Sequence, residues 1–235
     1  MQWGNFSLAT GVDYSTGKYG QPVATDILYV PLTGKYETGP WVFKLTVPWI
    51  QITGPANVIP DIGVIRPSTT TQRTTHSGLG DIVASVSRDI YAPPGGPLVD
   101  ILAKIKFGTA SFSEGLGTGE NDYSLALEAA QAFGRVTIFG DAGYKLVGSP
   151  AGVHLDNVAF GSLGASYKID TGFTAGAVFD LQQRSSPTGG PHEELTAYVS
   201  KTLSRSWKAQ LYALKGFSTL GSPNWGGGAT ISYLF

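Results

Sequence analysis

The stretch "WVFKLTVPWI", residues 41–50, separates into two chemically different faces when every second residue is taken. One face holds Trp41, Phe43, Leu45, Val47 and Trp49, and the other holds Val42, Lys44, Thr46, Pro48 and Ile50. A β-strand points successive side chains to opposite faces, whereas a helix would scatter them around its circumference. The stretch therefore predicts a strand with one apolar face that is aromatic at both ends.

The composition excludes several classes of protein. The 235 residues allow one large domain or two small ones, and only 14% are charged, against roughly 25% in ordinary soluble domains. The formal net charge of −1 gives no indication of a nucleic-acid partner. The chain has no cysteine, which excludes a disulfide framework, thiolate catalysis and cysteine-ligated zinc.

Two kinds of membrane or targeting segment are not found in the sequence. It has no run of about 18 apolar residues, so we expect no transmembrane helix. It also shows no signal peptide, because Met1 leads almost directly into a strand-like pattern. We interpret the sequence as a mature or recombinant form whose targeting segment has been removed.

The alternating pattern recurs twelve times along the chain. The predicted strands cover residues 3–16, 24–37, 40–53, 78–92, 97–112, 121–134, 135–148, 157–169, 172–184, 192–204, 206–217 and 224–235. Most of these segments exceed the five or six residues that are usual for a strand in a soluble protein. They match the 9–11 residues that a tilted strand needs to cross a bilayer.

The connections between these strands alternate between short and long. "ETGP", "APPGGP", "FGR", "KIDTG" and "LSRSW" are tight turns, and the longest connection covers about residues 54–77. Short periplasmic turns and long extracellular loops are typical of outer-membrane barrels. We therefore predict an all-β, transmembrane, antiparallel up-and-down β-barrel of 12 strands. It forms a single domain over residues 1–235, with both termini in the periplasm.

Aromatic residues are expected at the two ends of the apolar outer face. The predicted lipid-interface aromatics are Trp41, Trp49, Tyr91, Phe133, Trp207, Trp225, Tyr233 and Phe235. Eight residues separate Trp41 from Trp49. At about 3.3 Å per residue and a tilt of about 40°, they cover roughly 20 Å, close to the apolar band of about 25 Å.

A soluble β-sandwich or lipocalin-like barrel is the alternative fold, because a period of two does not say which face is inside. The aromatic girdles, the strand lengths and the C-terminus favour the membrane barrel. The last segment, "NWGGGATISYLF" at residues 224–235, is apolar at alternate positions and ends in Phe235. It resembles the recognition signal that the barrel-assembly machinery reads in bacterial outer-membrane proteins. The last strand is expected to pair with the first, since an open edge in lipid leaves backbone groups unsatisfied at several kcal/mol each.

Residues 8–54 and the segment "GLGDI" at 78–82 carry a more specific resemblance. The "TGVDYSTGKYG" hairpin, the "YETGPW" turn and the "GLGD" strand start resemble the outer-membrane channels named for the meta-pathway of phenol degradation. The resemblance implies a monomeric twelve-stranded barrel in a Gram-negative outer membrane, in contact with lipid and lipopolysaccharide. It also implies passive diffusion of small molecules, with aromatic or hydrophobic catabolic substrates as candidates. We expect no cofactor.

Charged residues on the second face of the strands are predicted to line the pore. They are Lys44, Asp81, Asp100, Lys104, Lys106, Glu128, Asp141, Lys145, Asp180, Glu194 and Lys208. On the lipid face, a lysine at the midplane would cost about 2–4 kcal/mol. These charges could pair and brace the wall, for example Asp100, Lys104 and Lys106 with Glu128, or form a constriction whose field selects ions or polar groups, and both can hold at once. The similar numbers of acids and bases argue against strong charge selectivity.

Several further positions leave alternatives open. The connection 54–77, which holds Arg66 and Arg73, is either an inward-folded constriction or a mobile surface loop. Arg88 and Lys201 fall on the outward face, where snorkelling or a bulge would accommodate them. Pro31 and Pro48 lie inside predicted strands and remove ladder hydrogen bonds, so they mark either a weak seam for lateral exit or tolerated bulges.

The sequence gives little support for catalysis. His76, His154 and His192 all fall in predicted extracellular connections, each near a serine or an acidic residue. The nucleophile pattern G-x-S-x-G is absent from the sequence. We therefore expect a channel rather than an enzyme. An outer-membrane barrel hydrolase with an extracellular histidine site and a non-transporting structural barrel are the alternative functions.

Overall fold

The computed structural model describes residues 4–55, 58–60, 62–65 and 71–235. Trp3, the first residue of the first predicted strand, and Arg66 lie outside the described residues. Within these ranges the chain is all-β. No helix in them is long and apolar enough to cross a membrane.

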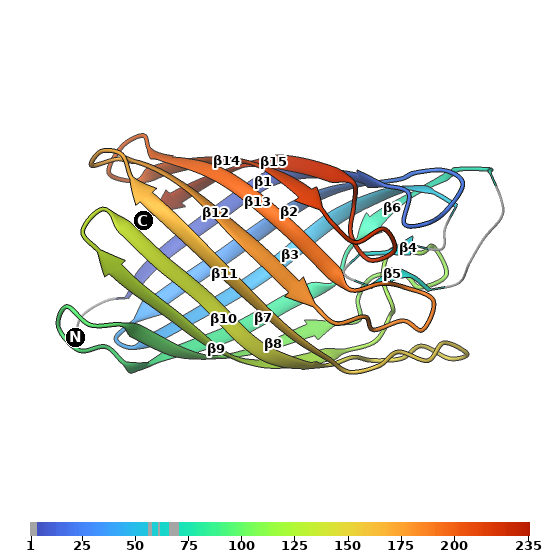
Figure 1. Cartoon of the computed structure of the whole chain (residues 1–235), viewed down its shortest axis with the longest axis horizontal. Helices are drawn as coiled ribbons and strands as arrows, with labels where there is room; N and C mark the ends of the chain where they lie inside the picture. The colour runs from blue at the N-terminus through green and yellow to red at the C-terminus, as the bar shows by residue number, and fades with distance from the viewer. Residues whose placement is uncertain (1–3, 56–57, 61, 66–70) are drawn as a thin grey trace.

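Twelve long strands form the wall of a barrel, and three short strands lie near one end of it (Figure 1). The wall strands are β1 (Asn5–Gly17), β2 (Thr25–Thr38), β3 (Trp41–Gly54), β7 (Ile82–Tyr91), β8 (Leu98–Phe107), β9 (Asp122–Phe133), β10 (Val136–Leu146), β11 (Val158–Lys168), β12 (Phe173–Gln182), β13 (His192–Thr202), β14 (Trp207–Gly216) and β15 (Trp225–Leu234). The short strands are β4 (Val58–Ile59), β5 (Gly63–Val64) and β6 (Thr74–Leu79).

Each wall strand pairs antiparallel with the wall strands before and after it in the chain, and β15 pairs with β1 to close the barrel. The closing ladder runs from Ser7 opposite Leu234 to Thr16 opposite Trp225. The start of β1 and the end of β15 lie at the short-turn end in Figure 1, and β4, β5 and β6 lie at the long-loop end. The structure confirms the predicted closed twelve-stranded antiparallel barrel.

The register between strands places large apolar side chains on the outside of the barrel. Leu163 is 67% exposed and Leu211 is 58% exposed, although both lie near the middle of wall strands. Leu125 and Leu127 on β9 are also more than half exposed. Such a continuous apolar exterior would be unfavourable in water and is the arrangement that outer-membrane barrels present to lipid.

Aromatic rings gather at both ends of this apolar exterior. At the long-loop end, the ring centroids of Tyr14 and Trp225 are 5.7 Å apart. At the short-turn end, Tyr233 lies 4.9 Å from Trp207 and 4.8 Å from Phe235, again between ring centroids. Their use as membrane-interface anchors stays a prediction, as it does for Trp41, Trp49, Tyr91 and Phe133.

Two outward basic residues lie near the short-turn end of the barrel, and one of them lies over an aromatic ring. The guanidinium carbon of Arg88 lies 5.1 Å from the centre of the Trp41 ring, a cation–π geometry at the short-turn end. Lys201 lies opposite Phe173, also near that end. Long basic side chains at such positions can reach the polar interface.

The strand predicted over 78–92 begins earlier and is interrupted. Residues 74–79 pair with β3 as strand β6, so the loop predicted over 54–77 was wrong for its last four residues. The pairing with β3 shifts by one residue between the pair Trp49–Leu79 and the pair Thr46–Val83. The segment Gly80–Asp81 therefore contains one extra residue. This is a β-bulge, which re-aims a side chain and bends the strand.

The two prolines of the predicted seam lie directly opposite each other. Pro31 on β2 faces Pro48 on β3. The β1–β2 ladder has no partner pairs between Thr10–Leu32 and Asp13–Tyr29. The carbonyl groups remain in use, because the Thr10 hydroxyl donates to Pro31 at 2.9 Å and the Gly80 amide donates to Pro48 at 2.9 Å. The β1–β2 ladder therefore has fewer paired residues at this point.

An arginine at the middle of the outer face should be costly, whereas one at its edge should not. Leu127→Arg places a charge half-way along β9, and we expect it to lower the free energy of unfolding by about 2–4 kcal/mol. Gln131→Arg, on the same face of β9 near the short-turn end, is the matched control and should cost about 0–1 kcal/mol. Denaturant unfolding in lipid vesicles measures both, and equal costs would contradict the assignment of the outer face.

Candidate functional site

Apolar side chains from several long loops pack over one end of the barrel. Val58 and Val64 of the β4–β5 hairpin are each 1% exposed and pack with Tyr19. Ile59 packs with Leu155 from the β10–β11 loop. A further cluster joins Ala110 and Leu116 of the β8–β9 loop to Ile27, Ile50 and Ile52 on the inner wall. The described part of the connection after β3 thus folds inward as a cap rather than standing free on the surface.

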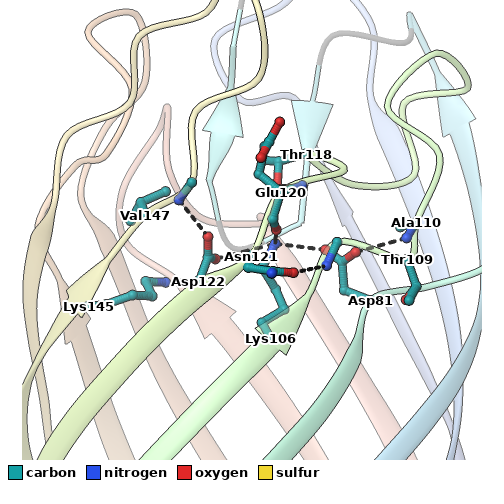
Figure 2. A network of polar contacts seen from close by, with 12 residues as sticks. Asp81, Lys106, Thr109, Ala110, Thr118, Glu120, Asn121, Asp122, Lys145 and Val147 are labelled. Atoms are coloured by element: carbon teal, nitrogen blue, oxygen red, sulfur yellow. Dashed lines mark hydrogen bonds and ion pairs between the residues drawn. The ribbon is translucent and has the colours of Figure 1, made fainter.

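The β8–β9 loop is held in this cap by an ion-pair network around Lys106 (Figure 2). The Lys106 ammonium lies 2.8 Å from Asp81 Oδ2 and 3.3 Å from Asp122 Oδ2. It also donates to the Thr118 hydroxyl at 3.2 Å and to the Glu120 carbonyl at 3.3 Å. The three charged side chains are 7–19% exposed, so the network is largely shielded from solvent.

The bulge at Gly80–Asp81 explains how Asp81 reaches this network. Its extra residue lets Asp81 point inward, towards Lys106, directly after the inward position of Gly80. The second carboxylate oxygen, Oδ1, accepts the amide hydrogen of Ala110 at 2.9 Å. One side chain therefore bonds both to the wall and to the loop.

Cavities lie inside the barrel, and two of them are lined in part by the cap. The largest, of about 390 Å³, is lined by Asp13, Tyr29, His192, Glu194 and Tyr212 among others. A second, of about 120 Å³, is lined by Lys104, Lys106 and Lys145 with Asp81 and Asp122. Both are lined by Tyr29, Ile50, Ile59 and Pro60, so Ile59 and Pro60 of the cap lie between an acidic and a basic chamber.

A third cavity, of about 280 Å³, is lined by both basic and acidic side chains. Its lining includes Lys104 and Lys145 together with Asp141, Asp180 and Glu194. Lys145 donates to Gln182 Oε1 at 2.6 Å. Cavities of this size with a few convergent polar groups are the usual setting for a small-molecule site.

The register places the predicted pore-lining charges of the wall strands on the face opposite the exposed apolar residues, and the bulge turns Asp81 to the same side. On β8 and β9, for example, Lys104 is opposite Ser124 and Asp100 is opposite Glu128, whereas Ile101 and Leu127 pair on the outer face. Lys44 lies opposite Ser85, and Lys208 lies opposite Ser232. That these groups contact a permeating solute stays a prediction.

The expected pairing of Glu128 with Lys104 or Lys106 was wrong. Glu128 lies opposite Asp100 on β8 and opposite Asp141 on β10, so its neighbours in the ladder are acids. Lys106 pairs instead with Asp81 and Asp122. Sequence spacing alone could not show this, because the register between strands decides which side chains face each other.

Sequence reasoning also missed several groups on the inner face. Asp122 starts β9 and shares the face of Ser124 and Glu128, so the period of two was an available signal. The Tyr212 hydroxyl donates to Asp13, and these residues are 199 positions apart. No local pattern predicts that contact, since it depends on closure of the barrel.

The three histidines have different surroundings. His154 is 79% exposed and lies 3.3 Å from Asp156. His192 Nε2 lies 3.2 Å from Glu194 Oε1, inside the barrel. His76 Nε2 lies 3.2 Å from the Thr74 hydroxyl, rather than bonding the adjacent Ser77. In the described ranges, no group of three or more histidine and acidic residues is arranged to hold a metal ion.

Comparisons with known proteins identify the fold. No family model and no curated protein matches the sequence. The structure is similar to the COG4313 outer membrane channel from Pseudomonas putida F1, with a TM-score of 0.76 and 11% identity over 100% of this chain and 97% of that one. It is also similar to the NanC porin, with a TM-score of 0.65 and 10% identity over 96% and 98% of the two chains.

The translocator domain of the autotransporter NalP from Neisseria meningitidis is a third similar structure, with a TM-score of 0.59 and 10% identity over 99% of this chain and 89% of that one. At these identities the likeness establishes an outer-membrane β-barrel fold. Two of the three neighbours are a channel and a porin. The resemblance to the phenol meta-pathway family stays a prediction.

Removing the Lys106 ammonium should loosen the β8–β9 loop. Lys106→Met leaves Asp81 and Asp122 without their cation, so we expect cleavage after Glu114 by a glutamate-specific protease to accelerate by at least about tenfold, as local opening becomes easier. Lys44→Met is the matched control and should leave the rate unchanged, since Lys44 lies opposite Ser85 and away from this loop. Unchanged cleavage in Lys106→Met would contradict the anchoring role.

Proposed function

We propose that the protein is a channel for passive diffusion of small molecules across a bacterial outer membrane. The observation that carries this proposal is the pairing of an apolar exterior with a cavity-containing interior whose walls bear lysine and carboxylate side chains. A solute would follow its own concentration gradient along this polar path. The protein would supply the path and no energy.

The orientation follows from the usual arrangement of such barrels. The long loops and the cap would face the outside of the cell, and the short turns and both chain ends would face the periplasm. The exterior would contact lipid and lipopolysaccharide, and the barrel-assembly machinery would insert the chain. Each of the twelve wall strands that the structure describes is paired on both sides, so the wall offers a second chain no open edge, which favours a monomer.

Aromatic or hydrophobic catabolic substrates are the proposed cargo. Two features support them: the resemblance of residues 8–54 to the phenol meta-pathway channels, and the apolar part of the largest cavity. There Ile27, Tyr29, Ile50 and Ile59 lie beside Asp13 and Tyr212. An aromatic ring with a polar substituent would find both an apolar surface and hydrogen-bonding groups.

Liposome swelling and planar-bilayer conductance with the purified full chain test the proposal. A channel should let arabinose and small aromatic acids enter vesicles and should give discrete conductance steps. A non-transporting structural barrel should do neither. Because the cap lies over one end, Lys106→Met should be measured alongside the natural protein. Failure of both proteins to pass any solute would refute the channel.

The opposed prolines give a separate prediction about the route of hydrophobic solutes. If the wall near Pro31 and Pro48 opens sideways, then Pro31→Val with Pro48→Val should restore ladder donors and slow uptake of a hydrophobic solute such as toluene. Arabinose entry should stay the same, which makes it the internal control. Equal toluene uptake in both proteins would count against a lateral exit.

A further inference from the structure

Four lysines and two serines form one row across neighbouring strands of the inner wall. Lys35 on β2 faces Lys44 on β3, which faces Ser85 on β7. Ser85 faces Lys104 on β8, Lys104 faces Ser124 on β9, and Ser124 faces Lys145 on β10. These six side chains form one row, the lysine row, which extends across the five strand pairings from β2 to β10.

A second row runs beside the first and carries the opposite charge. Its members, in ladder order from β7 to β13, are Asp89, Asp100, Glu128, Asp141, Ser162, Asp180 and Glu194. On β8 the carboxylate row is represented by Asp100 and the lysine row by Lys104, and these two residues are four positions apart. That spacing is about 13 Å of strand length.

An uncharged strip separates the two rows. Its members face each other in the same ladders: Ser87, Leu102, Ala126, Gly143 and Phe160. The inner wall from β7 to β11 therefore presents a cationic row, a largely apolar strip and an anionic row, in parallel. Acids lie directly opposite one another along much of the anionic row, so like charges repel there, whereas serines separate most lysines of the cationic row.

Several members of the two rows are not neutralised by the protein. Within the residues that the structure describes, Lys44 and Lys104 form no ion pair, and neither do Asp100, Glu128 or Asp180. The inner wall therefore has cationic and anionic groups that remain available to a solute.

The cavity of about 280 Å³ is lined by members of both rows and by Phe160 of the strip between them. The Lys104 ammonium lies 5.9 Å from the centre of the Phe160 ring. Asp141 and Asp180 line the same cavity, and Ser162, beside Phe160 on that face of β11, faces both of them across the ladders. A ring placed over Phe160 would thus have a cation on one side and carboxylates on the other.

We infer that this cavity selects small zwitterions whose two charges stand at opposite ends of an apolar or aromatic body. The inference rests on the proposed channel function. The anionic end would approach Lys104 and the cationic end Asp180, with the body over Phe160. A solute with a single charge is attracted by one row and repelled by the other, whereas a zwitterion satisfies both.

Uptake of three matched solutes into proteoliposomes tests this selectivity at neutral pH. The zwitterion is 4-(aminomethyl)benzenesulfonate, the anion is 4-methylbenzenesulfonate and the cation is 4-methylbenzylamine, so the ring and its substitution pattern are constant. Leakage into protein-free vesicles is subtracted, and arabinose entry reports whether the channel is open. We expect the zwitterion to enter at least about threefold faster than either ion.

Substitutions of charged residues test whether this cavity causes the faster entry of the zwitterion. Lys104→Gln and Asp180→Asn should each remove most of the zwitterion advantage, whereas Lys168→Gln should keep it. Lys168 lies opposite Thr174 on β12 and belongs to neither row. Arabinose entry with no zwitterion advantage in the natural protein would overturn the selectivity and leave the channel standing. Exclusion of every solute, arabinose included, would overturn the channel itself and the selectivity with it.

Discussion

Closure of the backbone hydrogen-bond ladder between β1 and β15 is the constraint on which the rest of the structure depends. In an apolar surrounding, each unsatisfied backbone amide or carbonyl costs several kcal/mol, so a sheet with two free edges would not be stable there. The pairing of Ser7–Thr16 with Trp225–Leu234 removes both edges at once. It also brings Asp13 to Tyr212, a contact that joins the two ends of the chain inside the barrel.

Once the ladder is closed, the period of two fixes the chemistry of both surfaces. A slip of one residue would exchange the inner and outer faces of a strand, so each side chain's position depends on register. The bulge at Gly80–Asp81 is a local departure from this rule, and it turns Asp81 towards Lys106. The same register rule sets Lys44 and Lys104 in one row and Asp100, Glu128 and Asp180 in another, so the selectivity that we propose depends on this alignment rather than on net charge.

Much of the wall could be predicted from the sequence, because its pattern is local. The strand predicted over 40–53 is β3, Trp41–Gly54, since its alternation is nearly complete. The strand predicted over 97–112 ends at Phe107 instead. There Gly108 approaches the backbone of Gly119, where an added Cβ would lie 2.3 Å from the Gly119 carbonyl carbon. The chain leaves the wall at this close contact between loop segments, which alternation does not report.

The site was less predictable than the wall. Alternation indicated the face of Glu128 and Lys106 but not their partners, because those lie on other strands whose register is set by turns and by closure. The inward folding of the β4–β5 hairpin depends on Val58 and Val64 packing against Tyr19, which is distant in sequence. Such tertiary contacts produce no periodic pattern in the local sequence. The sequence therefore could not decide whether this loop is an inward-folded constriction or a mobile surface loop.

The central claim is that the leucine face of the wall meets lipid and the carboxylate face meets an enclosed aqueous lumen. The chain has no cysteine, so single Leu127→Cys and Glu128→Cys variants can each carry one thiol, on adjacent residues of β9. In lipid vesicles, a fluorophore on Cys at position 127 should be quenched by brominated lipid. A thiol at position 128 should react with a small water-soluble maleimide and escape that quenching. The reverse pattern would contradict the account.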